Sequence, residues 1–136
     1  MTNEDTSNAY VEGDTGYLLL RGRDGALRGR ALVDADDFDE VARHRFHVHK
    51  RQVVRNIGPE HRKLPLDRIV LGLPPGAEWS VRHVNGDPLD CRRSNLVLGK
   101  ALLARALDED PAVAVLATQR AVARITGKRA PARVAA

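Results

Sequence analysis

The sequence predicts an α+β fold of small antiparallel hairpins and short helices that ends in a C-terminal helix. Apolar runs of strand length alternate with glycine-containing turns, which is typical of hairpins. Apolar side chains recur at helical spacing after residue 36, and an Ala- and Val-rich run begins at Pro111. A length of 136 residues corresponds to one domain, with room for tails.

Composition narrows the class of protein. Hydrophobic residues make up 43% of the chain and aromatic residues only 4%, which predicts a small aliphatic core. The net charge of +4 favours a polyanionic partner. The single cysteine, Cys91, excludes an internal disulfide or a cysteine-based zinc cluster. No apolar run approaches the ~18 residues of a membrane helix, and the N-terminus lacks a signal-peptide pattern, so we expect a cytoplasmic protein.

The N-terminal part divides into an acidic segment and a hairpin. Residues 1–15 contain acidic side chains, no Lys or Arg and no periodicity, which predicts a disordered leader. Residues 16–33 predict a hairpin with its turn at Asp24-Gly25. Arg28 and Arg30 share one face of it by the period of two. That face is either solvated or in contact with DNA phosphates.

Residues 34–77 complete a predicted hairpin and helix region that begins at residue 16 and binds DNA. Asp34 or Asp36 begins a short helix, and the acidic run after it is interpreted as helix-starting chemistry rather than as a metal site. Residues 45–57 predict a second hairpin, residues 60–63 a polar loop, and Pro65 the start of another short helix.

Basic residues of the second hairpin are candidates for DNA contacts. His47 and His49 share a face, and without further ligands in a fixed pattern they are DNA-facing, solvated or core residues. Lys50, Arg51 and Arg55 are the better candidates for phosphate contacts.

Residues 78–98 carry the strongest motif, EWSVRHVNGDPLDCRRSNLVL. This string resembles the core of the HNH nucleases, in the phage and actinobacterial homing-endonuclease-like branch that reads D-H-I-N-G-D-x-L-D-N-R-R-S-N-L. His83 and Asn95 match the family's His and central Asn, twelve residues apart. The resemblance covers roughly residues 30–98 and depends mostly on residues 81–96.

The resemblance implies a ββα core over residues 78–110, built around one divalent cation such as Mg²⁺. It implies that His83 is the general base that activates water and that Asn95, on the second strand, orients it. Arg92 and Arg93 would hold phosphates, and a helix over residues 100–107 would cover the site. Asn85-Gly86 predicts a tight turn.

The expected metal ligands are replaced in this chain. Arg82 stands where the family has an Asp ligand, and no His or Asn follows Asn95. Asp87 and Asp90 are the remaining candidates for ligands. Asp67 stands where the family has a His, and we expect it at the surface or beside the site.

Two functions therefore remain open at the level of sequence, both with double-stranded DNA as partner. The first is an HNH-type endonuclease or nickase that needs a divalent metal. The second is a DNA-binding protein derived from such a nuclease, without a cofactor, in which Arg82 takes the metal's place and pairs with a phosphate. In either case residues 111–136 predict a basic helix and tail, solvated or lying along DNA.

Overall fold

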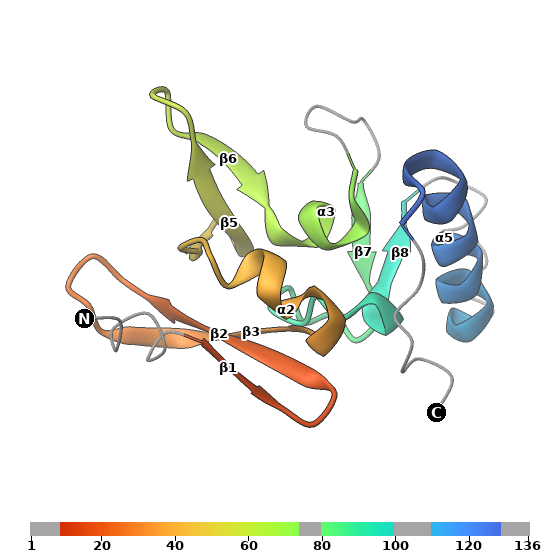
Figure 1. Ribbon diagram of the computed structural model, residues 1–136, viewed down its shortest axis with the longest axis horizontal. Helices are drawn as coiled ribbons and strands as arrows, with labels where there is room; N and C mark the ends of the chain where they lie inside the picture. Colours follow the sequence, from red (N-terminus) through yellow and green to blue (C-terminus); the bar gives the residue numbers. More distant parts are fainter. Residues whose placement is uncertain (1–8, 74–79, 100–109, 129–136) are drawn as a thin grey trace.

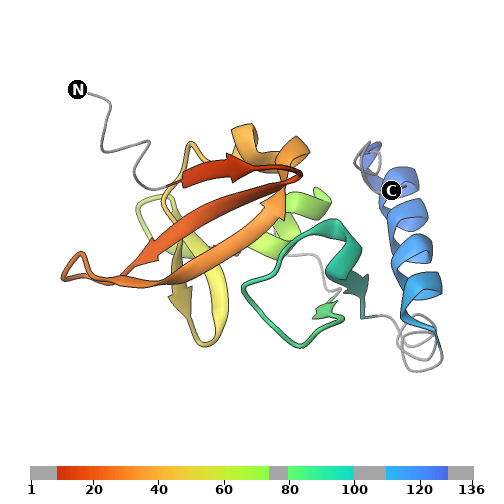
Figure 2. The ribbon, with the colours of Figure 1, turned by 90° about the horizontal axis from the view of Figure 1, so that it is seen from below.

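The computed structural model describes residues 9–73, 80–99 and 110–128. It is an α+β structure of three small antiparallel sheets, short helices and a C-terminal helix, as the sequence predicts (Figures 1 and 2). Within the described ranges, no helix is long and apolar enough to cross a membrane.

The first sheet contains β1 (Ala9–Glu12), β2 (Thr15–Arg21) and β3 (Leu27–Asp34) in that order. The predicted hairpin is confirmed, and Gly25 in its turn has a φ of 81°. The predicted disordered leader is wrong for residues 9–15, because β1 pairs with β2 in antiparallel register. A stack of Tyr10 on Tyr17, with ring centroids 4.9 Å apart, adds to this pairing.

Helix α2 (Ala35–Val41) follows β3 directly and lies against the first sheet, on the side that faces the second sheet and α3 (Figure 1). Its apolar side chains meet a sheet face that buries Leu18, Leu20 and Val33. Gly16 permits the close approach, since a Cβ there would lie 2.5 Å from Phe38 Cδ1.

The second sheet contains β4 (His47–His49), β5 (Gln52–Ile57) and β6 (Arg62–Pro65), again in chain order. The second hairpin is confirmed, but the predicted polar loop at residues 60–63 is wrong at its end, where residues 62 and 63 pair with β5. Lys50 and Arg51 form the turn between β4 and β5 with left-handed φ values of 52° and 68°. Helix α3 (Leu66–Leu71) then ends at the left-handed Gly72.

The third sheet pairs β7 (Val81–His83) with β8 (Leu96–Leu98). A 3₁₀ turn, η1 (Arg93–Asn95), precedes β8, so Asn95 lies just before the second strand rather than on it. Helix α5 (Pro111–Thr126) packs on β8, where Leu98 N–H donates to Thr118 Oγ1 over 3.1 Å (Figure 1). The helix expected over residues 100–107 lies outside the described residues.

The segment between β7 and β8 is fastened to the edge of the first sheet. Leu32 N–H donates to Leu89 O and Cys91 N–H donates to Leu32 O, each over 2.8 Å. A common core then joins the three sheets, with Leu20, Leu66 and Leu96 fully buried in it. Residues 80–98, called the HNH-like segment below, are therefore an integral part of the fold.

Candidate functional site

His83 ends β7 and has both ring nitrogens engaged. Nδ1 lies 3.0 Å from the main-chain oxygen of Asp90, and Nε2 lies 3.1 Å from Oδ2 of Asp67 on α3. A carbonyl oxygen only accepts hydrogen bonds, so Nδ1 carries a proton. Nε2 faces a carboxylate and donates to it when the ring is protonated, which makes the pair an imidazolium–carboxylate ion pair.

The surroundings of His83 favour its charged form. Burial by itself lowers the pKa of His83, because it penalises the imidazolium. The hydrogen bonds to Asp67 and to the Asp90 carbonyl, together with the negative charges of both carboxylates, outweigh burial and raise the pKa above its ordinary value. In this protonated state the ring has no lone pair with which to take a proton from water.

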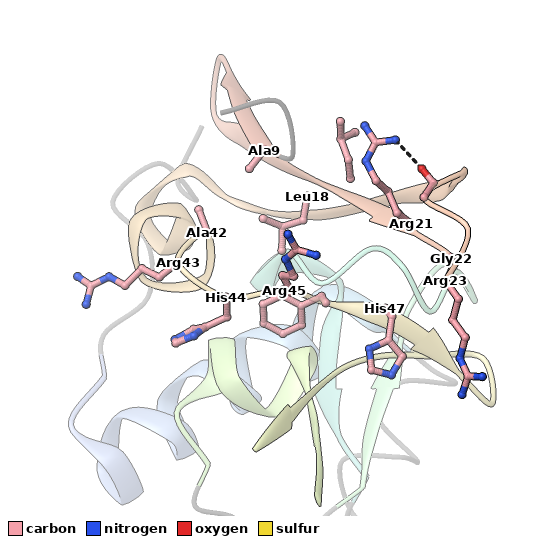
Figure 3. Close-up of a pocket in the computed structure, with 13 residues that line it drawn as sticks. Ala9, Leu18, Arg21, Gly22, Arg23, Ala42, Arg43, His44, Arg45 and His47 are labelled. Atoms are coloured by element: carbon pink, nitrogen blue, oxygen red, sulfur yellow. Dashed lines mark hydrogen bonds between the residues drawn. The ribbon is translucent and has the colours of Figure 1, made fainter. Parts of the chain in front are cut away.

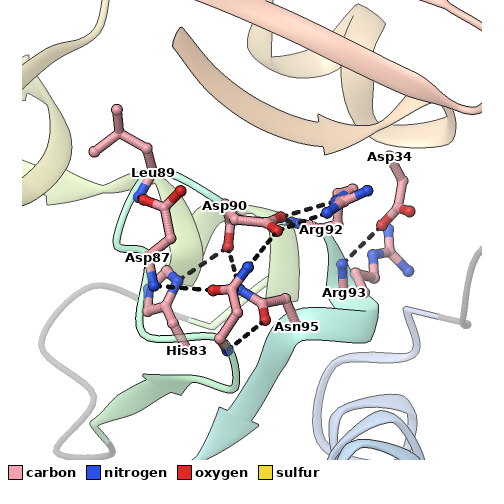
Figure 4. Close-up of polar contacts among 9 residues, drawn as sticks. Asp34, His83, Asp87, Leu89, Asp90, Arg92, Arg93 and Asn95 are labelled. Atoms are coloured by element: carbon pink, nitrogen blue, oxygen red, sulfur yellow. Dashed lines mark hydrogen bonds and ion pairs between the residues drawn. The ribbon is translucent and has the colours of Figure 1, made fainter. Parts of the chain in front are cut away.

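Asn95 ties together the loop between β7 and η1 (Figure 4). Its Oδ1 accepts from Asn85 N–H over 3.0 Å, and its Nδ2 donates to Asn85 Oδ1 over 3.0 Å and to the Asp90 main-chain oxygen over 2.9 Å. That oxygen is the one that also holds His83 Nδ1. Asn95 therefore acts on His83 through a shared carbonyl and not by direct contact.

Asp90 is the acidic centre of the loop and is only 2% exposed. Arg92 grips its carboxylate with two hydrogen bonds, Nε to Oδ1 over 2.9 Å and Nη2 to Oδ2 over 2.7 Å, and Asn85 adds a third. Burial raises the pKa of Asp90, but the contacts with Arg92 outweigh it and the pKa falls below its ordinary value. The same pair raises the pKa of Arg92.

Arg93 was expected to hold a phosphate, but the structure buries it in an ion pair within the protein. The residue is 5% exposed, and its guanidinium pairs with the buried Asp37 on α2 through both Nε and Nη2. Its main-chain N–H donates to Oδ2 of Asp34 over 2.8 Å (Figure 4). Asp34 and Asp37, in the acidic run that begins α2, therefore also bind Arg93 of the HNH-like segment. By its sequence alone, this run predicts only the start of the helix.

The described residues do not fit the divalent cation that the resemblance implies. The carboxylate of Asp90 is already neutralised by Arg92, and Asp87 is exposed with its Oδ1 accepting from Leu89 N–H. Alternation along β7 directs Arg82 to the face opposite His83, where it is exposed, so it does not stand beside His83 in a metal's place. Within residues 9–73, 80–99 and 110–128, no cluster of three or more His, Cys, Asp or Glu side chains could hold a metal.

The predicted DNA contacts outside the motif lie on the other two sheets. Arg28 pairs with Asp24 over 3.2 Å, and Arg30 donates to Tyr10 Oη over 2.7 Å while its guanidinium lies 4.9 Å from the centre of the Tyr17 ring. Lys50 and Arg51 are exposed at the tip of the β4–β5 hairpin, whereas Arg55 on β5 is half-buried. The structure therefore does not gather all the predicted cations into one site.

Asp67 was expected at the surface or beside the site, and the structure places it beside the site. It is 7% exposed in the first turn of α3 and pairs with His83, a partner that sequence reasoning did not name. The available signal was its place between Leu66 and the apolar run that ends α3, since an acid flanked by core residues needs a cationic partner.

Comparisons with models of protein families, with curated proteins and with solved structures find no match for this chain.

Proposed function

We propose that this chain is a DNA-binding protein in which the HNH-like segment is a structural scaffold and not a catalytic centre. The observation that carries the proposal is the engagement of both ring nitrogens of His83, one by the Asp90 carbonyl and the other by the Asp67 carboxylate. A general base needs a free lone pair within reach of the water that it deprotonates. His83 uses Nδ1 on a carbonyl and turns Nε2 toward a carboxylate, so neither nitrogen is directed at a water.

The other charges of the motif also support a scaffold. Arg93 and Asp37 are buried together, and Arg92 is held by the carboxylate of Asp90. These pairs fasten the loop to α2 and to itself. Residues that the resemblance assigns to phosphate and metal binding are thereby satisfied within the protein.

Binding to DNA is supported by exposed cations that form no ion pair with a carboxylate in the described part of the chain. The chain has a net charge of +4, and Lys50 and Arg51 are exposed side by side at a hairpin tip. Both adopt a left-handed backbone, which is unfavourable for residues other than Gly, Asn and Asp. Strained backbone positions cluster at functional sites, so the conformation of these two cations supports a binding role for the tip. Phosphate contacts of this kind produce salt-sensitive binding.

An HNH-type endonuclease or nickase is the second candidate, favoured by the ordered string of motif residues from His83 to Leu96. A plasmid-nicking assay in Mg²⁺, Mn²⁺ and Zn²⁺ separates the two functions when binding to the same DNA is followed over a range of salt concentrations. We expect salt-sensitive binding without cleavage. Metal-dependent nicking that disappears in His83→Ala, while that variant stays folded by circular dichroism, would contradict the scaffold and establish the nuclease.

A further inference from the structure

A cavity of about 510 Å³ lies between the end of β2 and the segment that connects α2 to β4 (Figure 3). Leu18 and Phe46 line it and belong to the buried core, so part of its wall is apolar. Its ionisable lining residues are all basic: Arg21, Arg23, Arg43, His44, Arg45 and His47. In the part of the chain that the structure describes, no carboxylate lines this cavity.

The arginines of this cavity differ from those of the HNH-like segment. Arg23, Arg43 and Arg45 are exposed, and none of them forms an ion pair with a described carboxylate. In Figure 3, Arg45 extends from the connecting segment toward Leu18 on β2, whereas Arg43 points outward at one rim. Cations gathered around one hollow repel one another, and an anion bound there would relieve that repulsion.

Burial and nearby positive charges together lower the pKa of the two histidines that line the cavity. Burial lowers the pKa of His44 first, and the neighbouring charges of Arg55 and Arg43 lower it further against the opposing effect of Glu40. For His47 the causes are burial and then Lys63 and His49. Each imidazole is thus neutral more readily than an ordinary histidine, and a neutral ring still offers an N–H donor to an anion.

The size and lining of the cavity indicate what kind of anion it would take. Its volume lies in the range of about 300–1,000 Å³ that is typical of small-molecule sites, which is more than a bare phosphate needs. Guanidinium groups bind phosphate with paired hydrogen bonds. The apolar side chains of Leu18, Leu19 and Phe46 suit a sugar or a base beside that phosphate.

We propose that this cavity binds a phosphate group together with the nucleotide that carries it. The contacts are the same whether that nucleotide is free or part of a nucleic acid. Where it belongs to DNA, the proposal rests on the DNA-binding function proposed above. Arg45 is then the central phosphate contact, and Arg23 and Arg43 strengthen the field at the rim.

A matched pair of double variants tests the proposal. Arg43→Gln with Arg45→Gln alters the cavity, whereas Arg120→Gln with Arg124→Gln removes the same charge from exposed positions on α5. The probes for calorimetric titration of the full chain are thymidine 5′-monophosphate and thymidine. We expect the monophosphate to bind, thymidine to bind at least about tenfold more weakly, and the cavity variant to lose about tenfold in affinity for the monophosphate. The α5 variant should bind it like the wild type.

A short DNA duplex forms the second arm of the test. Loss of one phosphate contact reduces the slope of log affinity against log salt concentration by about 0.9. If the monophosphate does not bind but the cavity variant shows this reduction relative to the wild type, the phosphate comes from the DNA backbone and the proposal stands. If the cavity variant binds like the wild type in both arms, the proposal is overturned. A wild-type chain that binds the monophosphate through Arg45 but binds no duplex would refute the proposed function alone.

Discussion

Two groups of arginines in this protein have opposite surroundings. In the HNH-like segment, Arg92 and Arg93 each grip a carboxylate, and one of the two pairs is fully inside the protein. Around the cavity near β2, Arg43 and Arg45 are exposed and form no ion pair with a described carboxylate. Arg92 and Arg93 of the motif are thus used in ion pairs within the fold, whereas among the described residues Arg43 and Arg45 are not. Under the proposals above, the recognisable motif and the binding surface do not coincide.

The largest effect should come from breaking the buried pair of the motif. Arg93→Ala leaves the carboxylate of Asp37 buried without its main partner, and we expect a loss of about 3–5 kcal/mol in the free energy of unfolding. Arg28→Ala is the control, because the side chains of its pair with Asp24 are 59% and 62% exposed, and we expect it to lose about 1 kcal/mol or less. Urea denaturation measures both. Equal losses for the two variants would contradict the claim that the buried ion pair stabilises the fold more than an exposed one.

We expect the second largest loss of stability from breaking the pair of His83 with Asp67. His83→Ala leaves Asp67 buried and unpaired, so we expect a loss of about 3 kcal/mol. The double variant His83→Leu with Asp67→Leu should recover most of that loss, since an apolar pair needs no charge compensation. Urea denaturation of the wild type and the variants provides the values. A His83→Ala variant as stable as the wild type would indicate a residue retained for chemistry instead.

At the hairpin tip, one double variant should raise stability and weaken DNA binding at the same time. Lys50→Asn with Arg51→Gly places residues that tolerate left-handed φ at both turn positions, so we expect the hairpin to gain about 1 kcal/mol. The same change removes two cations, and the salt dependence of DNA binding should weaken by up to about 1.8 in slope. Thermal unfolding and a salt series on a labelled duplex measure the two effects. Unchanged DNA binding would remove the tip from the proposed interface.

The smallest effect is a pH dependence of stability. Because the pKa of His83 is raised in the folded state, the stabilisation from its charge is fully present below the unfolded pKa of about 6.5. It is lost as the pH rises from there through the folded pKa. Asp67→Asn removes the carboxylate that favours the charged ring, so its stability should fall less over the same interval. Denaturation at several pH values on either side of 6.5 measures the difference, and parallel curves for the two proteins would count against the ion pair.

Local patterns predicted much of the fold. The Asp24-Gly25 and Asn85-Gly86 turns, the helix after Asp34 and the helix from Pro111 all follow from backbone preferences of neighbouring residues. The pairing of β1 with β2 was missed, because the acidic composition of the N-terminal segment outweighed its short apolar stretch at residues 9–11.

The candidate site was less predictable, because its partners come from distant parts of the chain. His83 and Asn95 were recognisable from their spacing, but Asp67 meets His83 only once α3 packs against β7. The partner of Arg93, Asp37, lies 56 residues earlier in the chain, so no local pattern indicates that this arginine is buried in an ion pair. The cavity likewise joins the end of β2 to the segment before β4, and no sequence motif marks it.

The most direct test of the account is an NMR titration of the histidine rings with nitrogen-15 detection. We expect His83 to titrate above the ordinary value of about 6.5, with both ring nitrogens protonated below its midpoint, and His44 and His47 to titrate below that value. One experiment would then show opposite pKa shifts for the histidine of the motif and for the two histidines of the cavity. A His83 that titrates at or below 6.5 would contradict the ion pair with Asp67 and restore a free base at the centre of the motif.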